Sequence, residues 1–178
     1  MQDKKTKTLV FSALFAALCC VTTLVPHIPT PLSGGYIHAG DALVILSAFA
    51  LGPLWGALAA GLGSGLADII TGCTWYAPGT FAIKALMALI AGLILRGGLF
   101  KKPAVNAFLA SFAAELFMVA GYFVYEYWIL SYGYGVIANV PMNAIQGAFG
   151  MVAGSALYLA LPLEKLNLKL EAQNRRTH

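Results

Sequence analysis

Long apolar runs alternate with short polar or turn-forming segments along most of the chain. Residues 8–26 and residues 127–163 contain no charged side chain. A helix needs roughly 20 mostly apolar residues to cross a hydrocarbon core of about 30 Å. Runs of this length and polarity therefore predict a bundle of membrane-spanning α-helices.

Proline and glycine divide these runs, because neither residue readily continues a helix. The segment "PHIPTPLSGGYIH" after the first run and the segment "TGCTWYAPGT" in the middle of the chain predict loops on the outer side. The second helix is short for a complete span. The six predicted helices cover residues 8–25, 41–52, 54–70, 80–95, 104–130 and 136–161.

Composition supports an all-α integral membrane protein with a single domain, residues 1–178. The chain is 60% hydrophobic and 10% charged, with a mean hydropathy of +0.78, whereas about a quarter of the residues in a soluble domain are charged. The six-helix bundle is expected to span residues 8–162. Residues 163–178 then form a basic tail.

The basic residues predict how the bundle is oriented. Ten of the eleven fall at residues 4–7, 96–102 and 165–176, and such groups collect on the cytoplasmic side of membrane proteins. All three groups, and hence both termini, are therefore expected to be cytoplasmic. The net charge of +4 follows from this topology. The tail is expected to touch anionic lipid, and no aromatic interleaving indicates nucleic-acid binding.

Asp68 and Lys84 stand out as charged residues within apolar sequence. A charge at the centre of a bilayer costs about 3 kcal/mol on insertion scales, so such side chains usually face the bundle interior. Both are predicted to lie about 6–9 Å below the outer ends of consecutive antiparallel helices. They are expected either to form an ion pair with each other or to contact one ligand together.

Polar residues on two further helices are predicted at the same level. Glu115, Tyr122 and Glu126 fall within about 40° of one another at 100° per residue. Asn139, Asn143 and Gln146 span about 60° by the same count. The inner halves, such as "ALMALIAGLIL", are nearly free of polar groups. This pattern predicts a pocket that opens to the outside and is closed below, and Glu115 is either a structural or a binding residue.

Residues of the predicted outer loops complete the candidate site. Trp75, Tyr36 and His38 either contact a ligand or, for the aromatic residues, belong to an interfacial belt. The spacing of His38 and Asp41 does not indicate a metal site, and the three cysteines lack the spacing of metal ligands. No GxxxxGK[ST], HExxH or GxSxG motif occurs, so we expect no enzyme activity, metal or cofactor.

Three segments, "GYIHAGDALVILSAFALGP", "GALAAGLGSGLADIITG" and "YAPGTFAIKALMALIAG", resemble the substrate-binding S components of energy-coupling-factor (ECF) transporters. The likeness covers residues 8–162 and is strongest to the riboflavin-type branch, which includes proteins assigned to hydroxymethylpyrimidine or pyridoxine. It implies a multi-pass protein of the prokaryotic plasma membrane that captures a vitamin from outside. A transmembrane scaffold subunit with two cytoplasmic ATPases would be its partner. Ala13 and Ala17 match the family's AxxxA docking motif.

The leading hypothesis is therefore a capture subunit for a vitamin or its precursor, with hydroxymethylpyrimidine or pyridoxine as the first candidates. Riboflavin is the alternative vitamin. An intramembrane enzyme that uses Asp68, Glu115 or His38 as acid or base, and a scaffold or lipid-binding protein, are the other classes. The predicted substrate-binding residues are Lys84, Asp68, Tyr122, Glu126, Asn139, Asn143, Trp75, Tyr36 and His38.

Overall fold

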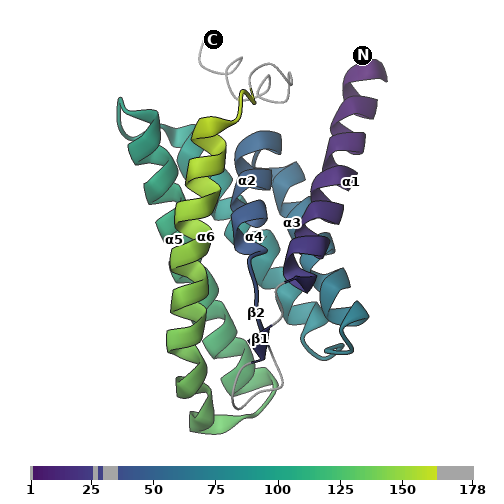
Figure 1. Cartoon of the computed structure of the whole chain (residues 1–178), viewed down its shortest axis with the longest axis vertical. Helices are drawn as coiled ribbons and strands as arrows, with labels where there is room; N and C mark the ends of the chain where they lie inside the picture. The colour runs from purple at the N-terminus through teal and green to yellow at the C-terminus, as the bar shows by residue number, and fades with distance from the viewer. Residues whose placement is uncertain (1, 26–27, 30–35, 164–178) are drawn as a thin grey trace.

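The computed structural model describes residues 2–25, 28–29 and 36–163, which form six α-helices and one short strand pair (Figure 1). A π-helical segment, η1, and a 3-10 segment, η2, lie between the last two helices. The elements in chain order are α1 (Gln2–Leu24), β1 (Ile28–Pro29), β2 (Tyr36–Ile37), α2 (Asp41–Leu51), α3 (Pro53–Ile70), α4 (Ala77–Gly97), α5 (Pro103–Val124), η1 (Tyr125–Ile129), η2 (Gly133–Asn139) and α6 (Val140–Ala160). The predicted all-α, six-helix fold is confirmed.

Helix limits follow from proline at the beginnings and glycine at the ends. Each of α3, α4, α5 and α6 has a proline in its first two positions, where the missing N–H breaks no hydrogen bond within the helix. Gly52 and Gly98 follow α2 and α4 with φ values of 86° and 57°, which side chains with a Cβ rarely adopt. The helix ends predicted at residues 52 and 95 fall at Leu51 and Gly97.

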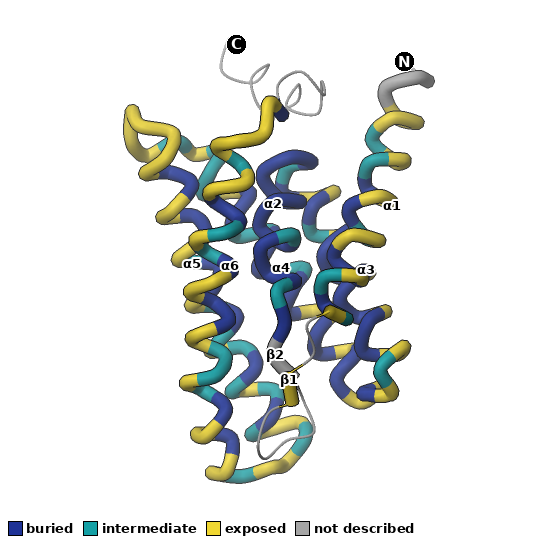
Figure 2. The backbone as a smooth tube through the Cα atoms, viewed as in Figure 1, coloured by how far each residue is buried: buried dark blue, intermediate teal, exposed yellow. Residues whose placement is uncertain are grey.

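Helix α2 is a short central helix. It has 11 residues, and all of them except Leu43 are buried (Figure 2). At about 1.5 Å per residue it covers roughly half of a hydrocarbon core, whereas five other helical segments are long and apolar enough to cross a membrane. It packs against α1, α3, α4 and α6, so any polar residue on it must find a partner inside the bundle.

Small residues let the helices approach closely. A Cβ at Gly61 would lie 2.9 Å from the carbonyl oxygen of Phe81 on α4, and one at Gly154 would lie 3.0 Å from Cβ of Ile45 on α2. Close backbone approach of this kind favours helix association in a membrane. Gly61 and Gly154 thus have a packing role inside the bundle.

The beginning of α1 and the end of α6 lie at the same end of the molecule (Figure 1). The opposite end, which we call the loop end, carries the β1–β2 pair and the turns that join α3 to α4 and α5 to α6. A chain that crosses the membrane an even number of times must have both termini on the same side. The assignment of that side to the cytoplasm stays a prediction. The predicted basic tail comprises residues 163–178. All of it except Leu163 lies outside the described residues.

The connection between α5 and α6 differs from the continuous helices that were predicted. The Leu130 N–H donates to the Tyr125 carbonyl oxygen at 3.0 Å, five residues back, and this widened turn defines η1. Segments of this kind occur often at functional sites. Since η2 precedes α6, Asn139 lies just before that helix and not within it.

Candidate functional site

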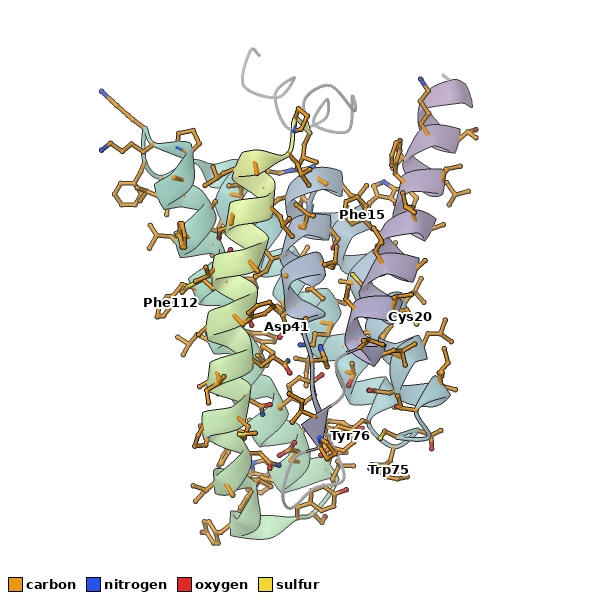
Figure 3. The ribbon with its side chains drawn as sticks, in the orientation of Figure 1. Phe15, Cys20, Asp41, Trp75, Tyr76 and Phe112 are labelled. Carbon is orange, nitrogen blue, oxygen red and sulfur yellow. The ribbon has the colours of Figure 1, made fainter. Side chains whose placement is uncertain are left out.

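An ion pair between α2 and α4 lies inside the bundle. Lys84 and Asp41 are both fully buried, and the ammonium Nζ contacts Oδ1 of the carboxylate. Of the two alternatives expected for Lys84 and Asp68, an ion pair with each other does not form, because α2 places Asp41 directly against α4. Asp41 lies near mid-height of the molecule (Figure 3). Lys84 is therefore buried in the bundle interior as predicted, but its ion-pair partner is Asp41 and not Asp68.

Gln146 and His38 extend this pair toward α6 and the loop before α2. Gln146 Nε2 donates to Oδ2 of Asp41 at 2.7 Å, and its Oε1 accepts from the backbone N–H of His38 at 2.9 Å. His38 Nδ1 in turn accepts from the N–H of Gly40 at 3.0 Å. We call Asp41, Lys84, Gln146 and His38 the ion-pair cluster.

A second buried group centres on Glu126 in η1. Its Oε1 accepts from the Tyr76 hydroxyl at 3.1 Å, and its Oε2 accepts from Asn139 Nδ2 at 2.8 Å. All three side chains are buried. We call them the Glu126 cluster. Glu126 and Asn139, both predicted to face one pocket, thus contact each other, whereas Tyr76 was not among the predicted substrate-binding residues.

Tyr122 on α5 lies beside the ion-pair cluster. Its hydroxyl donates to Thr80 Oγ1 at 3.1 Å, and its ring centroid lies 5.3 Å from Nζ of Lys84, a distance at which an ammonium is attracted to an aromatic face. Tyr122, Thr80 and Asp68 are all buried. The two clusters, Tyr122, Thr80 and Asp68 therefore form one polar region inside an apolar bundle.

The other predicted contacts are placed differently. Trp75 is 49% exposed and lies at the edge of the loop end (Figure 3), so its position fits the interfacial belt better than a pocket wall. Its carbonyl oxygen accepts from the Tyr125 hydroxyl at 2.7 Å. Asn143 is half-buried. The Tyr36 side chain is outside the described residues.

Glu115 lies apart from these hydrogen bonds. It is 5% exposed, and neither carboxyl oxygen has a hydrogen-bond partner among the described residues. It also lines a groove of about 190 Å³ between α5 and α6 whose other lining residues are apolar. Two of these, Phe112 and Leu116, are exposed, so the groove opens on the outer surface, and its polar lining residue, Glu115, lies next to Asp41 beside Gly150.

Ala13 and Ala17 lie on the exposed side of α1, next to exposed Leu14 and Leu18. The other small residues of α1 face inward: a Cβ at Gly63 of α3 would lie 2.8 Å from Cβ of Cys19. The small-residue surface of α1 therefore has two parts. One packs on α3, and the part with Ala13 and Ala17 is uncovered.

The polar region offers both hydrogen-bond donors and acceptors beside one aromatic face. Sites for small molecules usually combine apolar walls with a few placed polar groups. Within the described part of the chain, no three His, Cys, Asp or Glu side chains gather in a way that would hold a metal ion. The arrangement can donate hydrogen bonds to a small polar molecule and accept hydrogen bonds from it.

Comparisons with known proteins identify the family. A family model described as the S component of ECF-type riboflavin transporters matches residues 3–163. An uncharacterised protein from Pyrococcus woesei is 34% identical over 140 residues, which are 77% of this chain and 89% of that protein. The crystal structure of the S component for biotin from an ECF-type ABC transporter is similar, with a TM-score of 0.56 and 16% identity over 93% of this chain and 98% of that one. Since the family model spans nearly the whole chain, this protein belongs to the family of ECF-type riboflavin transporter S components.

Proposed function

We propose that this S component captures a small nitrogen-heterocyclic vitamin or precursor, with hydroxymethylpyrimidine or pyridoxine as the first candidates. The observation that carries the proposal is the polar region inside the bundle, where Lys84, Asp41, Tyr122 and Glu126 are all buried. The solute would then be delivered to an ATP-driven ECF module, since family membership makes the chain a transport subunit and not an enzyme.

Several buried charges are costly in a membrane protein, and such residues usually mark substrate or ion pathways. In this bundle they are spread over α2, α3, α4, α5 and η1, so no single helix contact explains them. The Tyr122 ring supplies a flat surface beside Lys84. A solute that combines one aromatic ring with several polar substituents matches this combination.

Size favours a single ring. The polar atoms of both clusters already lie within 3.1 Å of their partners. A solute that enters among them replaces or bridges these short contacts, so it needs few atoms. A tricyclic ring system would have to separate the helices further.

Riboflavin is the second candidate, and the observation that favours it is the description of the matching family model. The two candidates differ in ring size and therefore in the space they require between Tyr122 and Glu126.

The test is an equilibrium titration of the purified protein in detergent with hydroxymethylpyrimidine, pyridoxine and riboflavin, each followed by calorimetry. We expect saturable binding with one of the single-ring compounds at least tenfold tighter than with riboflavin. Tighter binding of riboflavin would contradict the single-ring assignment and identify riboflavin as the vitamin. If the folded protein binds no vitamin, the proposed function is wrong.

The same titration compares variants of two adjacent aromatic residues, Trp75 and Tyr76. Trp75→Ala is expected to change the affinity less than twofold, because the indole is half exposed at the edge of the loop end. Tyr76→Phe removes one of the two hydrogen bonds to Glu126, which is worth about 1–3 kcal/mol at a buried charged group, so we expect an affinity loss of at least fivefold. A larger loss with Trp75→Ala would contradict this assignment.

We further propose that the exposed face of α1 around Ala13 and Ala17 docks on the transmembrane scaffold subunit, to which the two ATPases are attached. Ala17→Trp is expected to abolish ATP-driven uptake in vesicles that contain the complete ECF module, while solute binding by the isolated subunit changes less than twofold. Leu86→Trp, on the exposed side of α4, is the control and should leave uptake intact. Normal uptake by Ala17→Trp would rule out this docking face.

A further inference from the structure

Glu115 on α5 is a buried carboxyl group that lies outside both clusters. Its side chain is buried, and neither of its oxygens has a hydrogen-bond partner among the described residues. Buried polar groups in folded proteins are nearly always hydrogen-bonded, because a buried atom without a partner loses the hydrogen bonds that water would give it. Both oxygens are therefore free to bind a further molecule.

Two glycines of α6 make room for this carboxyl group. A Cβ at Gly147 would lie 3.2 Å from Oε2 of Glu115, and a Cβ at Gly150 would collide with Oε1. A Cβ at Gly150 would also lie 2.7 Å from Cβ of Asp41, so the side chains of Glu115 and Asp41 are neighbours. Because glycine has no side-chain donor, α6 leaves the carboxyl oxygens unsatisfied at these two positions.

These surroundings favour the uncharged form of Glu115. An ionised carboxylate is stable in an apolar interior only beside a cation or several donors. The ammonium of Lys84 pairs with Asp41 instead, and a carboxylate beside another carboxylate is disfavoured. An uncharged carboxyl group presents an O–H donor next to a carbonyl acceptor. Its natural partner is a group with the same two functions in the opposite order.

The groove beside Glu115 has the size of one small ring. Its volume is about 190 Å³, and its other lining residues are apolar residues of α5 and α6. An apolar cavity of about 150 Å³ holds a benzene molecule. The groove therefore has space for one apolar ring or short chain together with a small polar group that reaches the carboxyl oxygens.

The groove opens toward the hydrocarbon core of the bilayer. Phe112 and Leu116 on its rim are exposed, and Phe112 lies at the outer edge of the molecule (Figure 3). Glu115 is about 18 Å along the helix from Pro103 and about 21 Å from Ile129, the two ends of this membrane-spanning segment. A ligand therefore enters from the middle of the bilayer, where a charged molecule is costly.

We propose that the groove between α5 and α6 is a second binding site, which takes a small uncharged molecule from the bilayer. The ligand is a single apolar ring or short chain with a primary carboxamide or a carboxylic acid group. Such a group has a donor beside an acceptor, so it forms two parallel hydrogen bonds with Glu115 while its apolar part contacts Phe112 and Leu116. This site goes beyond the proposed vitamin capture and does not depend on it.

The membrane-soluble reagent dicyclohexylcarbodiimide tests the site in the protein reconstituted into lipid vesicles. A carboxyl oxygen adds to the central carbon of the carbodiimide, and the carboxyl proton moves to a nitrogen. The adduct rearranges to a stable N-acylurea without a leaving group, and tandem mass spectrometry locates it. We expect Glu115 to be labelled and benzamide to slow this labelling at least fivefold. Toluene and N,N-dimethylbenzamide, which lack an N–H donor, should slow it less than twofold.

A matched pair of variants on α6 tests the position of the ligand. Ala148→Phe places a ring in the groove, so labelling of Glu115 should fall at least fivefold and benzamide should have no further effect. Ala156→Phe, at an exposed position of the same helix outside the groove, is the control and should behave like the wild type. Labelling and protection of Ala148→Phe at wild-type rates would contradict this position.

The labelling of the wild-type protein is decisive by itself if Ala148→Phe fails to fold. An unlabelled Glu115 in the folded protein overturns the proposal, because the carboxyl group is then either ionised or closed to the bilayer. Equal slowing by the three compounds, or slowing by none of them, overturns recognition by paired hydrogen bonds. Each of these results leaves the vitamin titration unchanged, so the proposed function is tested separately.

Discussion

Replacing Lys84 with methionine is expected to destabilise the protein by about 3–5 kcal/mol, the cost typical of breaking a buried ion pair. The methionine keeps much of the side-chain volume but leaves the Asp41 carboxylate buried without its cation. Gln146 alone would then donate to that carboxylate. Chemical unfolding of the detergent-solubilised protein, followed by circular dichroism, measures the loss.

The double variant Asp41→Asn with Lys84→Met separates charge from packing. If the lone carboxylate causes the loss, the double variant recovers most of the stability, since removing both partners of a buried pair is often neutral. Lys101→Met, at an exposed position before α5, is the control and should unfold like the wild type. A double variant as unstable as Lys84→Met alone would show that the unpaired Asp41 carboxylate does not cause the loss of stability.

Gly150→Val is expected to destabilise the protein by about 3 kcal/mol, at the upper end of the usual cost of overpacking. A Cβ at this position would lie 2.7 Å from Cβ of Asp41 and would also collide with a carboxyl oxygen of Glu115. The new side chain must therefore push α6 away from both α2 and α5. Because that shift also moves Gln146, solute affinity should fall more than tenfold.

Gly135→Ala is the matched control, because nothing lies within 4 Å of a Cβ at Gly135. It should leave the unfolding midpoint and the affinity unchanged within error. A Gly150→Val protein with wild-type stability and affinity would contradict the close contact of α2, α5 and α6 described here.

The fold was largely predictable, because it depends on the length and spacing of apolar runs. Prolines at the helix beginnings and glycines at Gly52 and Gly98 set the limits locally. The widened turn at Tyr125–Ile129 was not predictable from periodicity. A hydrogen bond to the carbonyl oxygen five residues back changes the helical periodicity. That change cannot be detected from the sequence in a segment where nearly every residue is apolar or aromatic.

The partner of Lys84 was the principal error in the site. The predicted depths concerned the consecutive helices that carry Asp68 and Lys84, whereas Asp41 lies on α2. One available signal pointed to the ion pair: the helix that Asp41 opens is apolar on every side, which is typical of a buried helix. An acid on such a helix must have a partner in the interior.

Sequence spacing also could not distinguish Trp75 from Tyr76. The two residues are neighbours in a short turn between α3 and α4, where neither helical nor strand periodicity applies. The turn directs Tyr76 to Glu126 and leaves Trp75 half exposed. Glu126, in contrast, was predictable because it shares a helical stripe with Glu115 and Tyr122, and all three are buried.

The central claim is that the solute binds in the polar region between Lys84, Tyr122 and Glu126. A crystal structure of the protein purified with its bound solute tests it most directly. We expect the solute ring against Tyr122, with a polar substituent within hydrogen-bonding distance of Glu126. Solute density in the groove between α5 and α6, or anywhere else outside the polar region, would contradict the claim.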